Sequence, residues 1–303
     1  MKKILLTGAN GFVGLHLAKE LSNNDIRVIG IGGSQGVEAV PKWFYDYQVL
    51  DLTDKDETLK INFEDIDGVI HLAGKAAVGP SFDDPMGYIN TNIGIEVNLF
   101  EAALSQNVFP KFLIISSGSL YDPAAGSPLS EESIVLPSSP YVVSKLGQEQ
   151  MAQYYTTRGF ECIIARPFNH IGPGQGLGFI VPDLASQIVS GSEVKVGNLE
   201  AERDYTDVRD IVRAYKLLLE KGTSGEIYNI CSGRSLSGHD LLDRMTSLVE
   251  HKPTIVSDPS KMRPSDNPII FGSHKKLTDA TGWEPTIDIE ITLQDVLNDW
   301  KNK

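Results

Sequence analysis

A glycine-rich turn directly after the first apolar run constrains this chain more than any other feature. Residues 4–6 are Ile-Leu-Leu, residues 7–14 read Thr-Gly-Ala-Asn-Gly-Phe-Val-Gly, and residues 16–21 form an amphipathic stretch. This order predicts a buried strand, a tight turn and a helix. Such a turn lets the backbone approach a diphosphate, which the free amides of the helix start then bind. An ordinary strand–helix turn is the alternative. The sequence therefore predicts a dinucleotide site near its N-terminus.

Strand-like apolar runs alternate with helical patterns through the first half of the chain. Helical periodicity covers residues 92–103 and about 141–158, and further strands are expected at residues 27–31, 47–50, 68–73, 111–117 and 161–166. Strands separated by helices are typical of βαβ units. The predicted fold class is therefore α/β, with a doubly wound parallel sheet of the Rossmann type.

The pattern changes after Pro167. Residues 172–178 are rich in Gly and Pro, a helix is expected around residues 182–190, and short strands are expected at residues 194–196, 226–231 and 254–256. We predict a dinucleotide-binding domain of residues 1–168 and about 204–235. A smaller, discontinuous α/β lobe for the substrate would comprise residues of about 169–203 and 236–303, the latter with two or three helices. The cleft between them, at the carboxyl edge of the sheet, is the expected ligand site.

Charge and cysteine content exclude several classes of function. The chain of 303 residues has a net charge of −13, which argues against a nucleic-acid or an anionic membrane partner. Cys162 and Cys231 lie in apolar stretches without metal-ligand spacing. We therefore expect buried, reduced thiols, no metal and a cytoplasmic location. We expect no signal peptide, and no apolar run is long enough to cross a bilayer.

A Tyr-x-x-x-Lys pair, Tyr141 and Lys145, carries the predicted chemistry. Residues four apart share one face of a helix, and an ammonium beside a phenol lowers the pKa of that phenol toward neutrality. Such a phenol can give a proton to a carbonyl oxygen while a hydride arrives at the carbon. Ser117 ends the preceding strand and could hydrogen-bond the same oxygen. A surface Tyr–Lys contact and a turn-capping serine are the alternatives.

Five segments occur together in one order: Thr-Gly-x-x-Gly-x-x-Gly, His-Leu-Ala at residues 71–73, Ser-Ser-x-x-x-Tyr, Tyr-x-x-x-Lys, and Arg-Pro-Phe-Asn at residues 166–169. In this combination nearly the whole chain resembles the extended short-chain dehydrogenase/reductase family, also called the NAD-dependent epimerase/dehydratase family. Its members modify nucleotide sugars. The resemblance implies an NAD(P)H-dependent oxidoreductase in which Ser117 and Tyr141 act on a carbonyl group and Lys145 holds the nicotinamide ribose.

The resemblance also implies the remaining contacts to the cofactor. Asp51 resembles the family's adenine contact, although a helix N-cap is its alternative role. Together with Tyr141 and Lys145, the implied cofactor-binding residues are Gly8, Asn10, Gly11, Phe12, Val13, Asp51, Leu52, Leu72, Ala73, Gly74, Lys75, Pro167 and Phe168.

Residues 166–175 and 196–210 resemble the GDP-sugar enzymes within that family. In such enzymes two arginines, here Arg203 and Arg263, grip the diphosphate. Guanidinium groups suit this task, because a dianion inside an acidic protein needs local positive charge. A surface ion pair is the alternative for each arginine. The implied substrate contacts are Ser117, Asn169, Val196, Gly197, Asn198, Arg203, Arg263 and Asp266.

The residue two positions before Tyr121 bears on the type of reaction. The dehydratases that resemble this chain carry an acid there, whereas this chain has Ser119. A neutral hydroxyl cannot remove the C5 proton of the sugar at neutral pH. Epimerase/reductases that make GDP-fucose place a Cys near this position, which is also absent. We therefore expect a nucleotide-sugar 4-ketoreductase, of the type that reduces GDP-4-keto-6-deoxy-D-mannose to GDP-D-rhamnose, although those reductases carry Glu at this position.

Several alternatives use the same three side chains. A dTDP-4-keto-6-deoxyhexose reductase of the 6-deoxytalose type and a nucleotide-sugar 4-epimerase both stay open, as does the stereochemistry at C4. A cofactor-sensing regulator is disfavoured, since such proteins tend to lose Tyr141 or Lys145. Residues 32–35 read Gly-Gly-Ser-Gln and offer neither the carboxylate that suits NAD nor the arginine that suits NADP, so NADH and NADPH are both possible.

The family also implies a homodimer that pairs two helices from each subunit. The helices near residues 92–106 and 141–158 are the candidates. Ile93, Val97 and Phe100 recur at helical spacing on the first of them, but packing in the core would explain these positions equally well.

Overall fold

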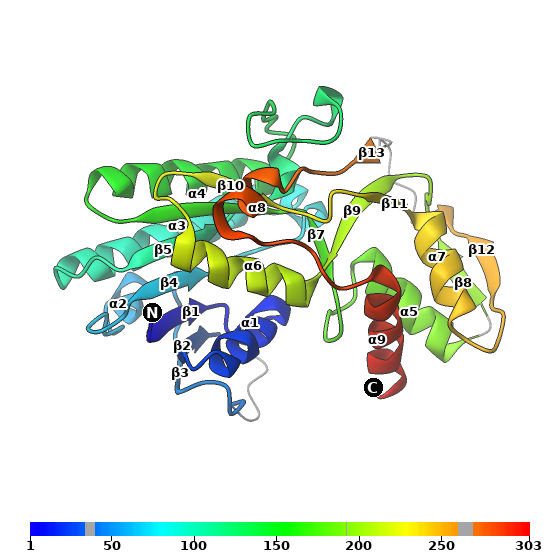
Figure 1. Cartoon of the computed structure of the whole chain (residues 1–303), viewed down its shortest axis with the longest axis horizontal. Helices are drawn as coiled ribbons and strands as arrows, with labels where there is room; N and C mark the ends of the chain where they lie inside the picture. The colour runs from blue at the N-terminus through cyan, green and yellow to red at the C-terminus, as the bar shows by residue number, and fades with distance from the viewer. Residues whose placement is uncertain (34–39, 192, 260–268) are drawn as a thin grey trace.

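The computed structural model describes residues 1–33, 40–191, 193–259 and 269–303, and is centred on a seven-stranded parallel sheet (Figure 1). The strands lie in the order β10-β6-β5-β4-β1-β2-β3. The order reverses between β1 and β4, and the carboxyl ends of strands at such a point form a ligand crevice. The predicted doubly wound sheet is therefore confirmed. The strands are β1 (Lys3–Thr7), β2 (Arg27–Gly32), β3 (Asp46–Val49), β4 (Gly68–His71), β5 (Lys111–Ile115), β6 (Cys162–Pro167) and β10 (Ile227–Ile230).

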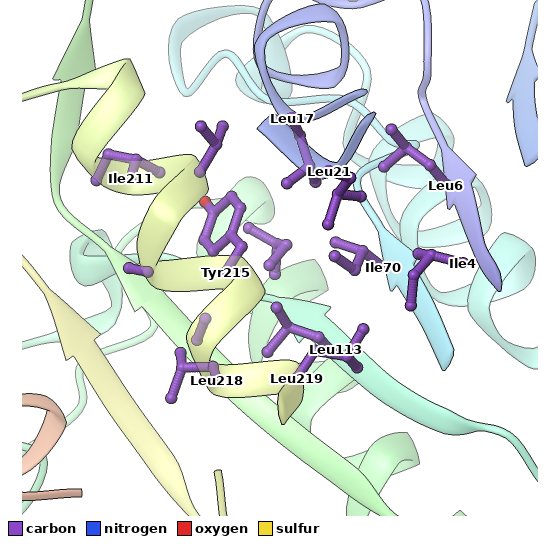
Figure 2. Close-up of a cluster of buried hydrophobic side chains, with 14 of the residues drawn as sticks. Ile4, Leu6, Leu17, Leu21, Ile70, Leu113, Ile211, Tyr215, Leu218 and Leu219 are labelled. Carbon is purple, nitrogen blue, oxygen red and sulfur yellow. The ribbon is translucent and has the colours of Figure 1, made fainter. Parts of the chain in front are cut away.

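Helices cover both faces of this sheet because its strands are apolar on both sides. On one face, α1 (Phe12–Asn23) and α6 (Val208–Lys221) bury Ile4 and Leu6 of β1, as Figure 2 shows. On the other face, α3 (Pro85–Ser105) and α4 (Pro140–Thr157) lie in the core that contains Leu5. Alternate residues of β1 thus enter opposite cores, as expected for a strand buried on both sides.

Helices α3 and α4 pack closely against each other along the sheet (Figure 1). Gly147 of α4 makes this approach possible, since a Cβ atom there would collide with Ile93 of α3. Phe100 is fully buried in the core, whereas Ile93 and Val97 are only partly buried. Core packing therefore explains Phe100, while Val97 packs at the edge of the same core and Ile93 lies against Gly147 of α4.

A second group of elements extends from the carboxyl edge of the sheet. Strands β7 (Asn169–Ile171), β9 (Glu202–Asp207), β11 (Ser235–Ser237) and β13 (Ile269–Ile270) form a four-stranded sheet, and β8 (Glu193–Val196) pairs with β12 (Thr254–Ser257). Helices α5 (Ile180–Ser190), α7 (Gly238–Ser247) and α9 (Ile289–Lys301) pack around a separate core (Figure 1). The strands predicted at residues 194–196 and 254–256 are present.

The remaining short elements connect these two groups. Helix α8 (Lys275–Thr281) packs on α6 and β10, and its Leu277 belongs to the core on the α1 side of the main sheet. The one-turn helix α2 (Lys55–Thr58) and three 3₁₀ turns, η1 (Gly79–Phe82), η2 (Gly118–Leu120) and η3 (Pro123–Ala125), complete the described chain. Both cysteines are free and buried, as predicted. No helix among the described residues is long and apolar enough to span a membrane.

Candidate active site

The glycine turn lies at the carboxyl end of β1, against the residues that follow β4. Gly8 has a φ angle of +65°, and a Cβ atom there would lie 2.9 Å from the backbone nitrogen of Ala73. A Cβ atom on Gly14 would collide with the carbonyl oxygen of Gly8 and lie 2.8 Å from that of Ala9. Glycine is therefore required for the turn and for the close seating of α1 on it.

The start of α1 provides donors for an anion. Its N-cap is Gly11, an exposed residue that offers no side-chain acceptor to the first amides of the helix. Uncapped amides at a helix start bind phosphate well, and the positive end of the helix dipole adds to this. The turn, the uncapped helix and their place at the point of strand reversal together fit the diphosphate of a dinucleotide.

Ser117 and Tyr141 meet at the same edge of the sheet. The N-cap Ser139, whose Oγ accepts a hydrogen bond from Val142 N at 3.2 Å, fixes the first turn of α4 and thereby Tyr141. A hydrogen bond links the hydroxyl of Ser117 with the phenol, and each of the two residues is 7% exposed. The Tyr88 ring packs edge-on against Tyr141, with centroids 6.4 Å apart. The structure thus brings the predicted serine and tyrosine together in a position that is largely buried from solvent.

The phenol is not acidic in this structure. Burial raises the pKa of Tyr141, and the hydrogen bond with Ser117 lowers it by less. Lys145 does not offset the rise, because its Nζ donates to the carbonyl oxygen of Ile115 at 2.8 Å and to Oε1 of Gln148 at 2.9 Å. The expectation that Lys145 brings the phenol pKa toward neutrality is therefore wrong here. A phenol that keeps its proton is the form that can protonate a carbonyl oxygen.

A buried polar cluster surrounds Lys145. Burial lowers the pKa of Lys145 to about 8, against the opposing effect of Glu96 and Glu149. Glu149 is held by Arg166, with Nε–Oε1 and Nη2–Oε2 distances of 2.7 and 2.6 Å, and accepts a third hydrogen bond from Ser116 at 2.6 Å. The sequence prediction did not include Glu96, Gln148 or Glu149. Gln148 and Glu149 lie three and four residues after Lys145 and therefore share its face of α4. This spacing is the sequence feature that could have identified them.

The residues after β4 line the other side of the glycine turn. Ala73 N donates to Thr7 Oγ1 at 3.1 Å, and His71 Nδ1 lies 2.8 Å from the same oxygen. Burial lowers the pKa of His71 to about 3, so this ring is neutral at physiological pH. Gly74 is exposed, Leu72 is partly buried, and Lys75 forms an ion pair with Asp84 at 2.5 Å.

The other predicted cofactor contacts have mixed surroundings. Asp51 is exposed and its Oδ1 accepts hydrogen bonds from Thr53 N and Oγ1 at 2.9 and 2.6 Å, whereas Asp54 is the N-cap of α2. Asp51 therefore closes a turn rather than capping that helix. The side chains of Leu52 and Phe168 are buried in hydrophobic cores, while Asn10, Phe12 and Val13 are partly buried at the turn. Pro167 is the last residue of β6.

The predicted substrate contacts lie on the second group of elements. Val196 is buried in its core, Gly197 is partly buried, and the exposed Asn198 accepts a hydrogen bond from Glu200 N at 2.9 Å. Arg203 lies on β9, and Asn169 is exposed on the neighbouring β7. Arg263, Asp266 and residues 34 and 35 lie outside the described residues.

Comparison with known proteins finds a family whose members resemble this chain. Residues 4–231 match the model of the NAD dependent epimerase/dehydratase family. GDP-6-deoxy-D-mannose reductase of Pseudomonas aeruginosa is 35% identical over 311 residues, which span 100% of this chain and 98% of that protein. The solved structure of RMD from Pseudomonas aeruginosa complexed with NADPH has a TM-score of 0.86 at 34% identity, and the match covers 100% of this chain and 99% of that one.

A third relative differs in its named activity. The Thermus thermophilus UDP-glucose 4-epimerase complex with NAD has a TM-score of 0.89 at 25% identity, and the match covers 99% of both chains. These findings confirm the predicted nicotinamide cofactor and leave the choice between NADH and NADPH open. They also confirm the predicted family: the chain belongs to the NAD dependent epimerase/dehydratase family, the extended short-chain dehydrogenases/reductases.

Proposed function

We propose that this protein is an NAD(P)H-dependent 4-ketoreductase that converts GDP-4-keto-6-deoxy-D-mannose to GDP-D-rhamnose. The hydrogen-bonded pair of Ser117 and a protonated Tyr141 at the crevice carries this proposal. The GDP-6-deoxy-D-mannose reductase of Pseudomonas aeruginosa supports the choice of substrate. Ser119 supports reduction over dehydration, because no carboxylate stands at that position to remove a sugar proton.

The reaction requires one hydride and one proton at the ketone. A bound NAD(P)H supplies the hydride to C4. Tyr141 gives its phenolic proton to the C4 oxygen, which becomes the hydroxyl of the product. Ser117 would hydrogen-bond the same oxygen and orient it, and the Lys145 ammonium would hold the nicotinamide ribose.

The remaining contacts and the domain division stay part of the proposal. The glycine turn, with Gly8, Gly11 and the α1 amides, would hold the diphosphate of the cofactor. Arg203 and Arg263 would bind the diphosphate of the substrate, whose base and sugar would lie along residues 196–198. Residues 1–168 and about 204–235 would bind the dinucleotide, and about 169–203 and 236–303 the nucleotide sugar. Within the last segment, Leu277 of α8 packs in the core of the main sheet.

We further propose a cytoplasmic homodimer. The buried free thiols Cys162 and Cys231 support a reducing compartment. Val143 and Tyr154 of α4 are 41% and 45% exposed, and lie on the same helix pair as the partly buried Ile93 and Val97. An apolar surface on two adjacent helices supports pairing with a second copy as a four-helix arrangement.

The proposal is tested by mixing purified protein with GDP-4-keto-6-deoxy-D-mannose and either NADH or NADPH. We expect oxidation of one reduced cofactor for each GDP-D-rhamnose formed, and loss of absorbance with at least one of the two cofactors. The dTDP-4-keto-6-deoxy sugar is the control substrate, and faster turnover of it would identify the 6-deoxytalose type of reductase. No oxidation of either cofactor with either substrate would rule out the ketoreductase. A purified protein that retains tightly bound NAD and interconverts C4 epimers would instead identify an epimerase.

A further inference from the structure

Glu96 of α3 is a fully buried acid that the proposed reaction does not use. Its side chain is 0% exposed, and neither carboxyl oxygen has a hydrogen-bond partner among the described residues. A buried polar group without partners costs folding free energy, so its presence calls for an explanation. The neighbouring acid Glu101 on the same helix differs, because its Oε1 accepts a hydrogen bond from Tyr155 at 2.7 Å.

One polar side chain, that of Gln148, lies between Glu96 and Lys145. The Lys145 Nζ donates to Oε1 of Gln148 at 2.9 Å. The side-chain amide of Gln148 in turn faces the Glu96 carboxyl group, and Glu96 is the acid with the largest opposing effect on Lys145. Glu149, the other acid in reach of Lys145, is already held by Arg166 and Ser116. Glu96 is therefore the acid whose charge is left available to the lysine.

The other titratable groups around Glu96 and Lys145 are neutral or already paired. His71 faces Lys145 from β4 and is neutral, since burial lowers its pKa to about 3. Cys162 of β6 faces Glu96, and burial raises the pKa of that thiol to about 12, which keeps it neutral as well. Tyr141 keeps its proton, and Arg166 is engaged with Glu149.

We propose that Glu96 is a positioning residue, which orients Gln148 toward Lys145 and preserves the ammonium form of that lysine as the pH rises. The proposal rests on the role of Lys145 in the proposed function. At low pH the buried pair would carry a carboxylic acid and an ammonium. With increasing pH the first proton would leave Glu96, so the lysine would keep its charge beside the new carboxylate.

The attraction between the two charges favours this order of proton loss, because Lys145 lowers the pKa of Glu96 and Glu96 raises that of Lys145. Burial opposes both charges, since it raises the pKa of Glu96 well above its ordinary 4.5 and lowers the pKa of Lys145 to about 8. Without the carboxylate, the lysine would face the full desolvation effect and lose its proton at a lower pH. The alkaline limb of activity should therefore depend on Glu96, because the raised pKa of Tyr141 places the phenol's own titration above that of Lys145.

The test compares the pH profiles of kcat for the wild type, Glu96→Gln and the matched control Glu101→Gln. We expect the alkaline limb of Glu96→Gln to move down by about one pH unit, with activity near the wild-type level on the plateau below it. The control removes an acid from the same helix interface and should leave the limb in place. An unmoved limb in Glu96→Gln, or an equal shift in Glu101→Gln, would overturn the proposal.

A second measurement needs neither cofactor nor substrate. Because the pKa of Glu96 is raised on folding, its contribution to stability is present below its ordinary pKa of 4.5 and is lost as the pH rises toward its folded value. The free energy of unfolding by urea should therefore fall with rising pH in the wild type relative to Glu96→Gln. A constant difference would overturn the proposal. If the wild type reduces no ketosugar, the proposed function fails, while this comparison still decides how Glu96 titrates.

Discussion

The proton of Tyr141 is the smallest feature on which the proposed activity depends. Removing the hydroxyl with Tyr141→Phe should lower kcat by about 10²- to 10⁴-fold, the usual contribution of a general acid. The cofactor affinity should change little, because the ring would still pack on Tyr88. Steady-state kinetics and NADPH titration measure both. Tyr154→Phe, at an exposed phenol of the same helix, is the control. A Tyr141→Phe enzyme within about tenfold of the wild type would mean that the proton comes from another group.

Gly32 determines what can stand at the end of β2, where dinucleotide-binding folds place the residue that contacts the ribose. A Cβ atom there would collide with the hydroxyl of Tyr47 and lie 2.6 Å from Asn10 Oδ1. Gly32→Asp should therefore weaken the binding of NADH and NADPH alike. Adding Tyr47→Phe should restore NADH binding more than NADPH binding, since a carboxylate suits the ribose diol and repels the extra phosphate. Fluorescence titration measures these affinities, and unchanged binding by Gly32→Asp would contradict the close packing around Gly32.

Single residues differed in how far the sequence could predict them. Ser117 and Tyr141 were predictable, because Ser117 follows a strand and Tyr141 lies in the first turn of a helix at the same sheet edge. Glu96 was not, because its burial beside Lys145 depends on the contact between α3 and α4, which no local pattern encodes. The direction of the Tyr141 pKa was also not predictable, since it depends on burial and on where Lys145 points.

Helix α1 depends on a glycine for its position against the glycine turn. Gly14→Ala should push the helix off the turn, because the new Cβ atom would collide with the Gly8 carbonyl oxygen. We expect a loss of about 1–3 kcal/mol in the free energy of unfolding, as for other overpacked sites, together with weaker cofactor binding. Gly94→Ala is the control in α3, where no atom lies within 4 Å of the new carbon. It should stabilise the helix by about 0.5–1 kcal/mol. Equal effects of the two changes on urea unfolding would count against this explanation.

At the level of elements, most strands of the main sheet were predictable because they are short apolar runs, although β3 (Asp-Tyr-Gln-Val) is partly polar. Helix α6 was not among the predicted elements, although Val208, Ile211, Tyr215 and Leu218 recur at helical spacing and are buried. Strand β9 was also missed, because its sequence Glu-Arg-Asp-Tyr-Thr-Asp is polar. It is stabilised by pairing with β7, β11 and β13, which come from distant parts of the chain.

The assembly of the whole molecule makes a separate prediction. Val143→Glu should convert the proposed homodimer into a monomer, because it places a charge on the exposed apolar side of α4. The fold should remain intact, since this side chain is 41% exposed in the single subunit. Ile134→Glu, at a residue that is 68% exposed and belongs to neither α3 nor α4, is the control. Sedimentation velocity distinguishes the species. A monomeric wild type, or a dimer that survives Val143→Glu, would contradict the proposed interface.

The architecture of the whole chain was largely predictable, because alternating strands and helices and a right-handed crossover rule leave few topologies for the first 168 residues. In the second group of elements, the helix near residues 182–190 and the strands at residues 194–196 and 254–256 were predictable, but the pairing of its strands was not. Its four-stranded sheet joins β7, β9, β11 and β13, which lie far apart between residues 169 and 270, and α8 packs on α6 and β10 of the main sheet. Such pairings depend on which distant surfaces complement each other and have no local signature.

The most direct measurement is a crystal structure of this protein with a nicotinamide dinucleotide and GDP-D-rhamnose bound together. We predict that the Tyr141 Oη and Ser117 Oγ atoms both lie within hydrogen-bond distance of the C4 oxygen of the sugar, and that C4 faces the nicotinamide ring. A complex in which the sugar C4 lies against other side chains, with Tyr141 remote from the nicotinamide, would contradict the proposed reductase.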